Sequence, residues 1–498
     1  MEKDRTLKGH EGLLLQERDV HKDKQIDGEL SPSNKKQVEN TQEDGKGKSR
    51  WCWAIPKRYI LCFLVFWGFL LMNCERSCLS VAIVAMSSKR RVKEDGKWVT
   101  KAPEFHWDSK MKGIILSAFF YGYLVLQIPG GWLALRIGAK RVLGYAILVA
   151  SAIHTCLPML VRYNCTLFVV ARVLQGLALG VALPTNHVIW SYWSPAHEKS
   201  CLISFTVAGL SGGMLVAMPI SGFLSVYGFS GGWPSVFYFF GIIGMSWFFL
   251  WNFFVYETPE THPTITAEEK HIILATRPEK SSEGNRTDSV PWLAMVKSRP
   301  VWAIVVAHFA FDCSYYTLLV CMPLFLRDVH KFNIATTGVL AALPWLFMSI
   351  MTLIGGFLAD FLRRYMKTVY VRKLLYVSGM VGSSSFIILA GFPERSEIAV
   401  AFMCIAVAFF GFSFTGFMVN PLDIAPKYAG IIIGFSNCIS TSPGFIGPSL
   451  VGILTRDEKP SQWQLVFLGM GAISIFGIIV FTCLHQEKFS HGQVIMSN

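Results

Sequence analysis

Residues 130–141 read GGWLALRIGAKR, and residues 355–364 read GGFLADFLRR. Each copy closes an apolar segment with two glycines and then enters a loop rich in Arg and Lys. The same pattern at two distant places indicates an internal repeat, and therefore a chain built from two related halves. Gly131 and Gly356 carry no side chain, so we expect each copy to allow close packing of neighbouring helices.

Long apolar segments surround both copies of the repeat. A membrane-spanning helix needs ~20 mostly apolar residues. Segments of this kind occur on both sides of the polar stretch at 257–298. We therefore predict an all-α polytopic membrane protein with 12 transmembrane helices in two six-helix bundles. The predicted spans lie near 59–86, 112–135, 139–161, 166–193, 200–227, 233–255, 300–326, 335–362, 373–392, 398–419, 428–454 and 464–485.

The composition argues against other classes of protein. The chain has 498 residues, of which 52% are hydrophobic and 16% charged, whereas soluble domains carry ~25% charged residues. The net charge of +13 falls largely in loops beside apolar segments, so we predict no nucleic-acid partner. The 12 cysteines include no CxxC pair and lie mostly in apolar segments, so we predict neither a metal site nor a cofactor.

Polarity divides the chain into five parts. They are a disordered cytoplasmic tail at 1–57, an N-terminal six-helix bundle at 58–256, a cytoplasmic linker at 257–298, a C-terminal six-helix bundle at 299–487 and a cytoplasmic tail at 488–498. In the linker, Thr266 and Glu269 form a capping box. This motif predicts a short amphipathic helix under the bundle.

Basic loops predict the orientation of the chain. They follow the second and eighth predicted spans, on the side of both termini, with the residues Arg136, Lys140, Arg141, Arg363, Arg364, Lys367, Arg372 and Lys373. The positive-inside rule places this side in the cytoplasm, although the loop at 89–101 on the other side is also basic. The sequon at Asn164 then faces outward, which predicts a glycosylation site there.

The fourth predicted span carries four residues with a common direction. At ~100° per residue, Arg172, Gly176, Gly180 and His187 lie on one face. The two glycines form a GxxxG contact surface. A buried ionisable side chain points into the bundle, because exposure to lipid costs several kcal/mol. We assign Arg172 a structural role near the helix end, and the deeper His187 a functional role.

Charged residues also occur in the first and seventh spans. Glu75 and Arg76 are neighbours that point ~100° apart, so they do not face one spot. Arg76 suits bidentate binding of a carboxylate, and the alternative is a charge pair with no ligand. His308 and Asp312, spaced i, i+4, form either a proton relay or a satisfied polar pair. The lone His154 is expected to be a packed residue.

Enzyme motifs are absent from the sequence. It contains no Walker loop, nucleophile elbow, HExxH or Rossmann fingerprint. We therefore predict no catalytic residues, no enzyme activity and no pumping driven by ATP. The energy for transport would then come from an ion gradient or from the membrane potential.

Several segments resemble a known family. They are RSCLSVAIV at 76–84, FFYGY at 119–123, QIPGG at 127–131, PTNHVIWSYWSP at 184–195, VWAIVVAHF at 301–309 and NPLDIAPKYAG at 420–430. The glycine repeat and the fourth span resemble those of the major facilitator superfamily. The segments resemble its anion/cation symporter family, which comprises sialin, the vesicular glutamate transporters and the type I sodium–phosphate cotransporters. The sialin branch is the one that this chain resembles most.

The resemblance implies a secondary carrier of small organic anions, either sialic-acid-like or acidic amino-acid-like carboxylates, that works by alternating access. Arg76 and His187 match positions that bear on substrate binding in the family. Tyr121 and Asn186 lie in the matching segments, and we predict that they also contact substrate. The alternatives are a sodium-coupled phosphate carrier and a membrane sensor or scaffold without transport.

The coupling ion is open between H⁺ and Na⁺. Gln175 and Leu179 stand where sialin-like proteins carry glutamates implicated in proton coupling. Glu75, Asp312 and His308 are therefore the candidates for ion coupling in this chain. No further cofactor is expected.

The remaining expectations concern structure and location. Structural or conformational roles are expected for Gly131, Arg136, Arg172, Gly176, Gly180, Asp360 and Asp423. The expected partners are a small anion and membrane lipid, with the protein a monomer. Residues 11–15 resemble an acidic dileucine signal, so the expected location is a lysosomal or vesicular membrane, with the plasma membrane as the alternative.

Overall fold

The computed structural model describes residues 55–484, apart from 88–89, 95–96, 108, 276–289, 330–333, 394 and 456–458. The predicted tails, except residues 55–57, and the dileucine segment lie outside the described residues. The first half contains α3 (Lys57–Ser87), β1 (Arg90–Glu94), β2 (Lys97–Lys101), α4 (Ser109–Val125), α5 (Gln127–Ile137), α6 (Ala139–Tyr163), α7 (Cys165–Leu179), α8 (Ala182–Trp193), α9 (Lys199–Tyr227) and α10 (Pro234–Phe254).

The linker contains η1 (Pro259–Thr261), α11 (Ala267–Ala275) and α12 (Trp292–Lys297). The second half contains α13 (Arg299–Asp328), α14 (Ile334–Leu362), α15 (Thr368–Ala390), α16 (Ser396–Met418), α17 (Asn420–Ile424), η3 (Pro426–Tyr428), α18 (Ala429–Ser440), α19 (Pro443–Leu454) and α20 (Pro460–Leu484).

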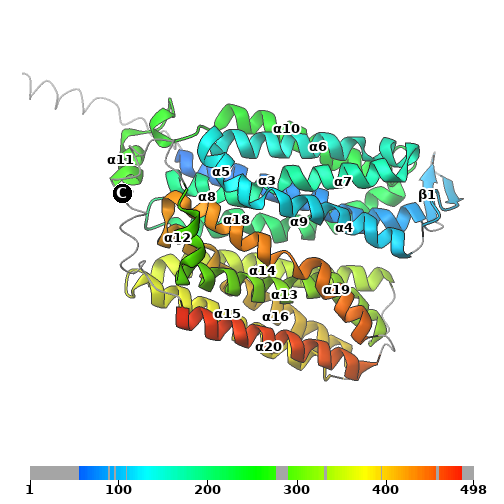
Figure 1. The fold of residues 1–498 in the computed structure, drawn as a ribbon. Helices are drawn as coiled ribbons and strands as arrows, with labels where there is room; N and C mark the ends of the chain where they lie inside the picture. The colour runs from blue at the N-terminus through cyan, green and yellow to red at the C-terminus, as the bar shows by residue number, and fades with distance from the viewer. Residues whose placement is uncertain are drawn as a thin grey trace, which may run out of the picture. The chain divides into compact units, whose positions relative to one another are not determined.

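The predicted number of membrane spans is confirmed. Among the described residues, 11 helical segments are long and apolar enough to cross a membrane. Met111–Val125 and Gln127–Ile137 are bent by 48° and supply the twelfth span if the pair crosses once. Figure 1 shows the helices of the first half above those of the second, with α18 lying between them against α5 and α8.

Prolines explain why four spans are broken. Each of these spans consists of two consecutive helices: α4 and α5, α7 and α8, α16 and α17, or α18 and α19. In each pair, a proline lies within the first three residues of the second helix. Proline has no N–H to donate, and its ring clashes with the carbonyl one turn earlier. The prolines are Pro129, Pro184, Pro421 and Pro443.

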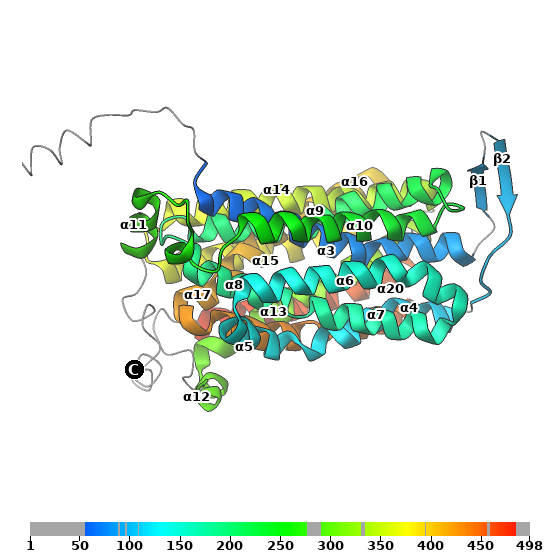
Figure 2. The same ribbon diagram turned by 90° about the horizontal axis from the view of Figure 1, so that it is seen from above.

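The first loop between spans forms a hairpin that the sequence analysis did not predict. Strands β1 and β2 pair antiparallel, with Arg90 opposite Lys101 and Glu94 opposite Lys97. Figure 2 shows this hairpin at the opposite end of the helices from α11. We call the end where α3 begins and α20 ends the terminus side. The fold is thus all-α in its spans, with one hairpin outside them.

The linker helix α11 caps the start of the first span. The hydroxyl of Thr266 accepts a hydrogen bond from the backbone N–H of Glu269 at 3.2 Å. The Glu269 carboxylate accepts bonds from the backbone N–H groups of Lys57 at 2.9 Å and Arg58 at 3.0 Å. Since the first N–H groups of a helix have no partner within it, this carboxylate satisfies two of them.

An ion pair continues this contact to α9. Arg58 Nε donates to Glu198 Oε2 at 2.8 Å, just before α9 begins. Partial burial acts to raise the pKa of Glu198, but the hydrogen bond and charge of Arg58 outweigh it and hold that pKa below its usual range. The linker, the first span and the fifth span therefore meet at one cluster of charges.

The repeat glycines lie at contacts between the halves. A Cβ added at Gly131 would come within 2.5 Å of the carbonyl oxygen of Gly430, on α18. A Cβ added at Gly356 would come within 2.7 Å of Cβ of Ser204, on α9. Each copy of the repeat thus brings its own half against the other half on the terminus side.

Candidate substrate site

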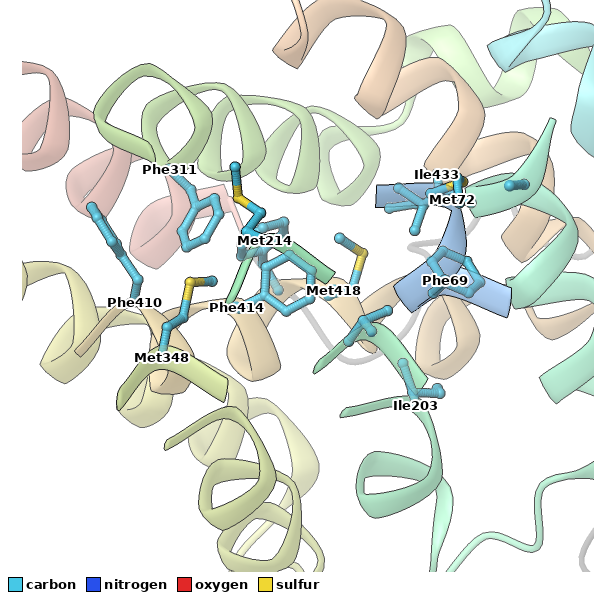
Figure 3. Close-up of a cluster of buried hydrophobic side chains, with 14 of the residues drawn as sticks. Phe69, Met72, Ile203, Met214, Phe311, Met348, Phe410, Phe414, Met418 and Ile433 are labelled. Atoms are coloured by element: carbon cyan, nitrogen blue, oxygen red, sulfur yellow. The ribbon is translucent and has the colours of Figure 1, made fainter. Parts of the chain in front are cut away.

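A small cavity of about 60 Å³ lies between the two halves. The first half contributes Met72, Asn73, Arg76, Tyr123, Leu183, Val207, Leu210 and Ser211. The second half contributes His308, Phe311, Asp312, Tyr315, Tyr316, Met348, Thr352, Phe414, Met418 and Asn437. Figure 3 shows a cluster of buried hydrophobic side chains, in which the lining residues Phe311, Met348, Phe414 and Met418 lie near Met214.

Arg76 provides a cation in the lining of the cavity, beside several aromatic rings. Its guanidinium carbon lies 4.6 Å from the ring centroid of Phe120 and 5.4 Å from that of Tyr316. It lies 5.8 Å from the centroid of Phe119 and 6.0 Å from that of Tyr123. Among the described residues, no carboxylate forms an ion pair with Arg76. Ring faces stabilise the cation, and a guanidinium has five N–H groups whose planar arrangement suits an anion.

Asp312 and His308 lie on one face of α13, as their spacing predicts. Asp312 accepts a hydrogen bond from the Ser440 hydroxyl at 2.7 Å, and His308 Nε2 is 3.4 Å from the same carboxylate. His308 Nδ1 lies 2.9 Å from the hydroxyl of Ser436. Both serines belong to α18. The second half thus presents an acid–base pair to a cavity in which the first half places a cation.

Glu75 does not line the cavity but lies inside the first half. Its carboxylate accepts hydrogen bonds from Ser151 Oγ at 2.6 Å and from Gln175 Nε2 at 3.2 Å. Arg172 donates to Gln175 Oε1 at 2.7 Å and to the backbone carbonyl of Glu75 at 3.3 Å. Arg172 therefore links α7 to α3 through hydrogen bonds in the buried interior, which agrees with the structural role expected for it.

His154 is packed in the interior as expected, and it belongs to the same polar cluster. Its Nδ1 lies 3.1 Å from Gln175 Nε2, and its Nε2 lies 3.5 Å from Cys78 Sγ. The ring is fully buried. Its partners Cys78 and Gln175 lie on α3 and α7, so they could not be predicted from the apolar segment that contains His154.

His187 contacts the other half rather than the cavity. Its Nε2 lies 2.9 Å from the carbonyl oxygen of Met418, on α16, and its Nδ1 lies 3.1 Å from that of Leu183. A neutral imidazole has one N–H and donates to one of these oxygens, whereas a protonated ring donates to both. Asn186 beside it is fully buried, and its amide atoms have no partner among the described residues. In this conformation neither side chain reaches the cavity.

The structure corrects the prediction for Tyr121. Its ring is 54% exposed and lies 6.3 Å from that of Phe445, outside the cavity. Tyr123 lines the cavity instead, and its hydroxyl accepts a bond from Asn437 Nδ2 at 3.4 Å, across the two halves. Residues two positions apart on a helix point to nearly opposite sides, so the sequence motif alone did not separate the two tyrosines.

The glycines of the fourth span bring α7 against α4. A Cβ at Gly180 would lie 2.5 Å from the carbonyl oxygen of Tyr123, and one at Gly176 would collide with that of Phe119. Asn164 is exposed at the start of α7, where its Oδ1 accepts a bond from the N–H of Thr166 at 2.7 Å. Glycosylation of Asn164 stays a prediction.

Polar contacts join the halves on the terminus side. Asp360 accepts bonds from the backbone N–H groups of Cys201 at 2.7 Å and Ser200 at 3.2 Å, at the start of α9. Asp423 accepts from Arg372 Nε at 2.8 Å within its own half, and from Lys199 Nζ at 3.3 Å across the halves.

The first copy of the repeat lacks the corresponding carboxylate. Leu135 stands there and packs against the cluster around Ile431 and Ile432. Arg136 is exposed, with its guanidinium 5.5 Å from the ring of Trp132. One contact between the halves is therefore polar, and its counterpart is apolar.

The fold and site define a membrane transport protein with two halves around a central charged cavity. Residues 65–448 match the family model of the Major Facilitator Superfamily. Sialin from Ovis aries is 40% identical over 88% of this chain and 90% of its own length. Vesicular glutamate transporter 2 from Bos taurus is 38% identical over 86% of this chain and 74% of its own length.

Solved structures show the same fold. The proton:xylose symporter XylE aligns with a TM-score of 0.66 at 15% identity, over 89% of this chain and 99% of its own. The E. coli fucose:proton symporter FucP aligns with a TM-score of 0.56 at 15% identity, over 85% and 99%. The chain belongs to the Major Facilitator Superfamily and, within it, to the family of sialin and the vesicular glutamate transporters. The predicted family and the predicted transport function are confirmed at this level.

Proposed function

We propose that this chain carries small organic anions across a membrane by alternating access, and that Arg76 binds the anionic group. The observation that carries the proposal is the setting of Arg76, whose guanidinium rests on aromatic faces without a carboxylate partner among the described residues. A cation held in this way in a cavity between the halves favours a carboxylate, which its planar N–H groups match in geometry. The relatives support a carboxylate, because one of them is a glutamate transporter.

The size of the cavity supports a mechanism that requires movement. At about 60 Å³ it has room for a water molecule or two, whereas ligand pockets measure roughly 300–1,000 Å³. The contacts of His187, Asp360 and Lys199 close the terminus side of this conformation. Substrate entry therefore needs the halves to separate, and rocking of one half against the other would open each side in turn.

Asp312 and His308 are the proposed coupling groups. They face the cavity together with Arg76, so the charge state of the acid–base pair would change the field that an incoming anion meets. A proton on Asp312 would remove the negative charge that opposes anion binding. Sodium bound near the carboxylate would have the same effect, so the coupling ion is proposed as H⁺ or Na⁺. Glu75, enclosed in the first half, is the other candidate.

We further propose a carrier rather than an enzyme, acting as a monomer, with both termini in the cytoplasm. The basic residues at the terminus side support this orientation. The vesicular relative supports a vesicular or lysosomal membrane.

Uptake by the purified full chain in proteoliposomes tests the proposal. Sialate, glutamate, aspartate, urate and phosphate are offered under separately imposed pH, sodium and voltage gradients. Saturable uptake of at least one organic anion is expected, and replacing sodium with choline at constant potential then identifies the coupling ion. Uptake of phosphate alone, lost without sodium, would contradict an organic-anion carrier. Absence of flux for the whole panel would favour a sensor or scaffold.

A further inference from the structure

A second pocket, of about 440 Å³, lies on the terminus side of the first half, away from the central cavity. It is formed at the first turn of α6 and the last turn of α10, where two membrane spans end. Its lining combines the basic residues Lys140 and Arg141 with aromatic rings. None of its lining residues belongs to the substrate site.

The charges of this pocket favour an anion. Lys140 Nζ donates to the carbonyl oxygen of Asn252 at 3.0 Å and lies 5.2 Å from the ring of Tyr256. An ammonium has three N–H donors, so two of them are left for a ligand. Arg141 is exposed and has no hydrogen bond or ion pair within the described part of the chain.

The acidic residue in the pocket does not cancel both cations. Glu257 accepts bonds from the backbone N–H groups of Ala139 and Lys140, the latter at 3.2 Å. Its carboxylate therefore offsets the positive end of α6 as well as one side-chain charge. Lys140 and Arg141 together exceed it in formal charge.

The apolar side of the pocket continues onto the membrane-facing surface. Tyr145 and Phe248 line it with ring centroids 5.4 Å apart, and Tyr145 is 58% exposed. Phe249 and Phe253, on the same helix as Phe248, are 71% and 75% exposed. Since these helices cross the membrane, such surfaces face acyl chains, and the basic residues at the helix ends lie at the level of the headgroups.

We propose that this pocket binds an anionic glycerophospholipid. Lys140 and Arg141 contact the phosphate, Tyr145 and Phe248 flank the glycerol region, and the acyl chains run along the exposed face of α6 and α10. Basic pockets between membrane helices are suited to lipid phosphates, because charge and apolar contact act on one ligand. The site is separate from anion transport, so its test does not depend on the proposed substrate.

Thermal unfolding of the full chain in detergent tests the site. The protein is titrated with phosphatidylglycerol, with phosphatidylcholine and with glycerol 3-phosphate, which has the charge but no chains. We expect phosphatidylglycerol to raise the unfolding midpoint saturably and well above the effect of the other two. Equal stabilisation by phosphatidylcholine would overturn the charge requirement, and equal stabilisation by glycerol 3-phosphate would overturn the lipid as ligand.

Three variants show whether the effect of phosphatidylglycerol depends on this pocket. Arg141→Gln should weaken the apparent affinity for phosphatidylglycerol about fivefold, the factor that corresponds to ~1 kcal/mol per basic residue at a lipid surface. Arg141→Lys keeps the charge and should retain most of the affinity. Arg364→Gln removes another exposed arginine on the same side but outside the pocket, and this variant should bind phosphatidylglycerol like the unaltered chain. Equal loss in Arg141→Gln and Arg364→Gln would show a general surface charge effect and refute the site.

Discussion

The carboxylate of Asp360 accepts a hydrogen bond from the backbone N–H of Cys201 at 2.7 Å, so an acid of the second half caps the start of α9 in the first. The same carboxylate also accepts from Ser200. A charged acceptor at a helix start is stabilised both by the N–H groups and by the helix dipole. In the proposed mechanism this contact breaks when the halves separate on the terminus side, so it favours the closed conformation.

Removing the Asp360 acceptor should therefore slow transport. A hydrogen bond to a charged group contributes about 1.5–3 kcal/mol. We expect Asp360→Leu, which copies Leu135 in the first repeat, to lower the uptake rate about tenfold or more. Asp360→Asn keeps one acceptor oxygen, so its uptake rate should lie between those of Asp360→Leu and the unaltered chain. The measurement is initial uptake normalised to the protein in the membrane, and unchanged rates in Asp360→Leu would refute a role in closure.

Gly131 offers a steric test of the same closure. A Cβ at this position would meet the backbone of Gly430, which has no flexible side chain to move aside. Gly131→Ala should hold α5 away from α18 and reduce uptake at least tenfold, with normal amounts of folded protein. Gly222→Ala is the matched control, because its added Cβ meets no atom within 4 Å beyond the backbone of its own helix and its chain neighbours. Equal activity of the two variants would show that this contact does not form during transport.

The buried cluster around Glu75 should couple two charges. Glu75→Gln removes the negative charge from a cluster that also contains the buried Arg172, and leaving a buried charge uncompensated costs on the order of 3 kcal/mol. A lower thermal midpoint is therefore expected for Glu75→Gln. The double variant Glu75→Gln, Arg172→Met should have a higher thermal midpoint than Glu75→Gln alone. Together with Arg172→Met, these variants form a double-mutant cycle. Strictly additive changes in stability within it would show that the two side chains are not coupled.

Acid should weaken the contact between the linker, α3 and α9. The pKa of Glu198 is lower in the folded chain than in the unfolded chain, where it is about 4.3. Its stabilisation is therefore present above that value and is lost as the pH falls through the folded-state pKa. The difference in thermal unfolding midpoint between the unaltered chain and Glu198→Gln should be largest near neutral pH and shrink as the pH falls below about 4.3. Glu397→Gln, at an exposed helix start, is the control. A difference that stays constant with pH would contradict the ion pair with Arg58.

The spans and the repeat could be predicted from the sequence because both depend on local composition. Apolar length marks each span, and the glycines at Gly131 and Gly356 mark positions where no side chain fits. The hairpin after α3 could not be predicted, since its residues carry the charges of an ordinary loop.

Contacts between helices that are distant in the chain could not be predicted from the sequence either. The partners of His154 and Asp360 come from other spans, and a motif that contains both Tyr121 and Tyr123 does not say which one faces inward. His187 was recognised as buried, but its contact with Met418 depends on how the halves pack.

Arg76 provides the most direct test of the central claim. Equilibrium binding and uptake of the transported anion are measured for the unaltered chain, Arg76→Lys, Arg76→Ala and the surface control Arg364→Gln, at matched amounts of folded protein. We expect Arg76→Ala to lose binding and uptake, Arg76→Lys to retain a small part because an ammonium lacks the planar pair of donors, and Arg364→Gln to behave normally. Full anion binding by Arg76→Ala would contradict the account.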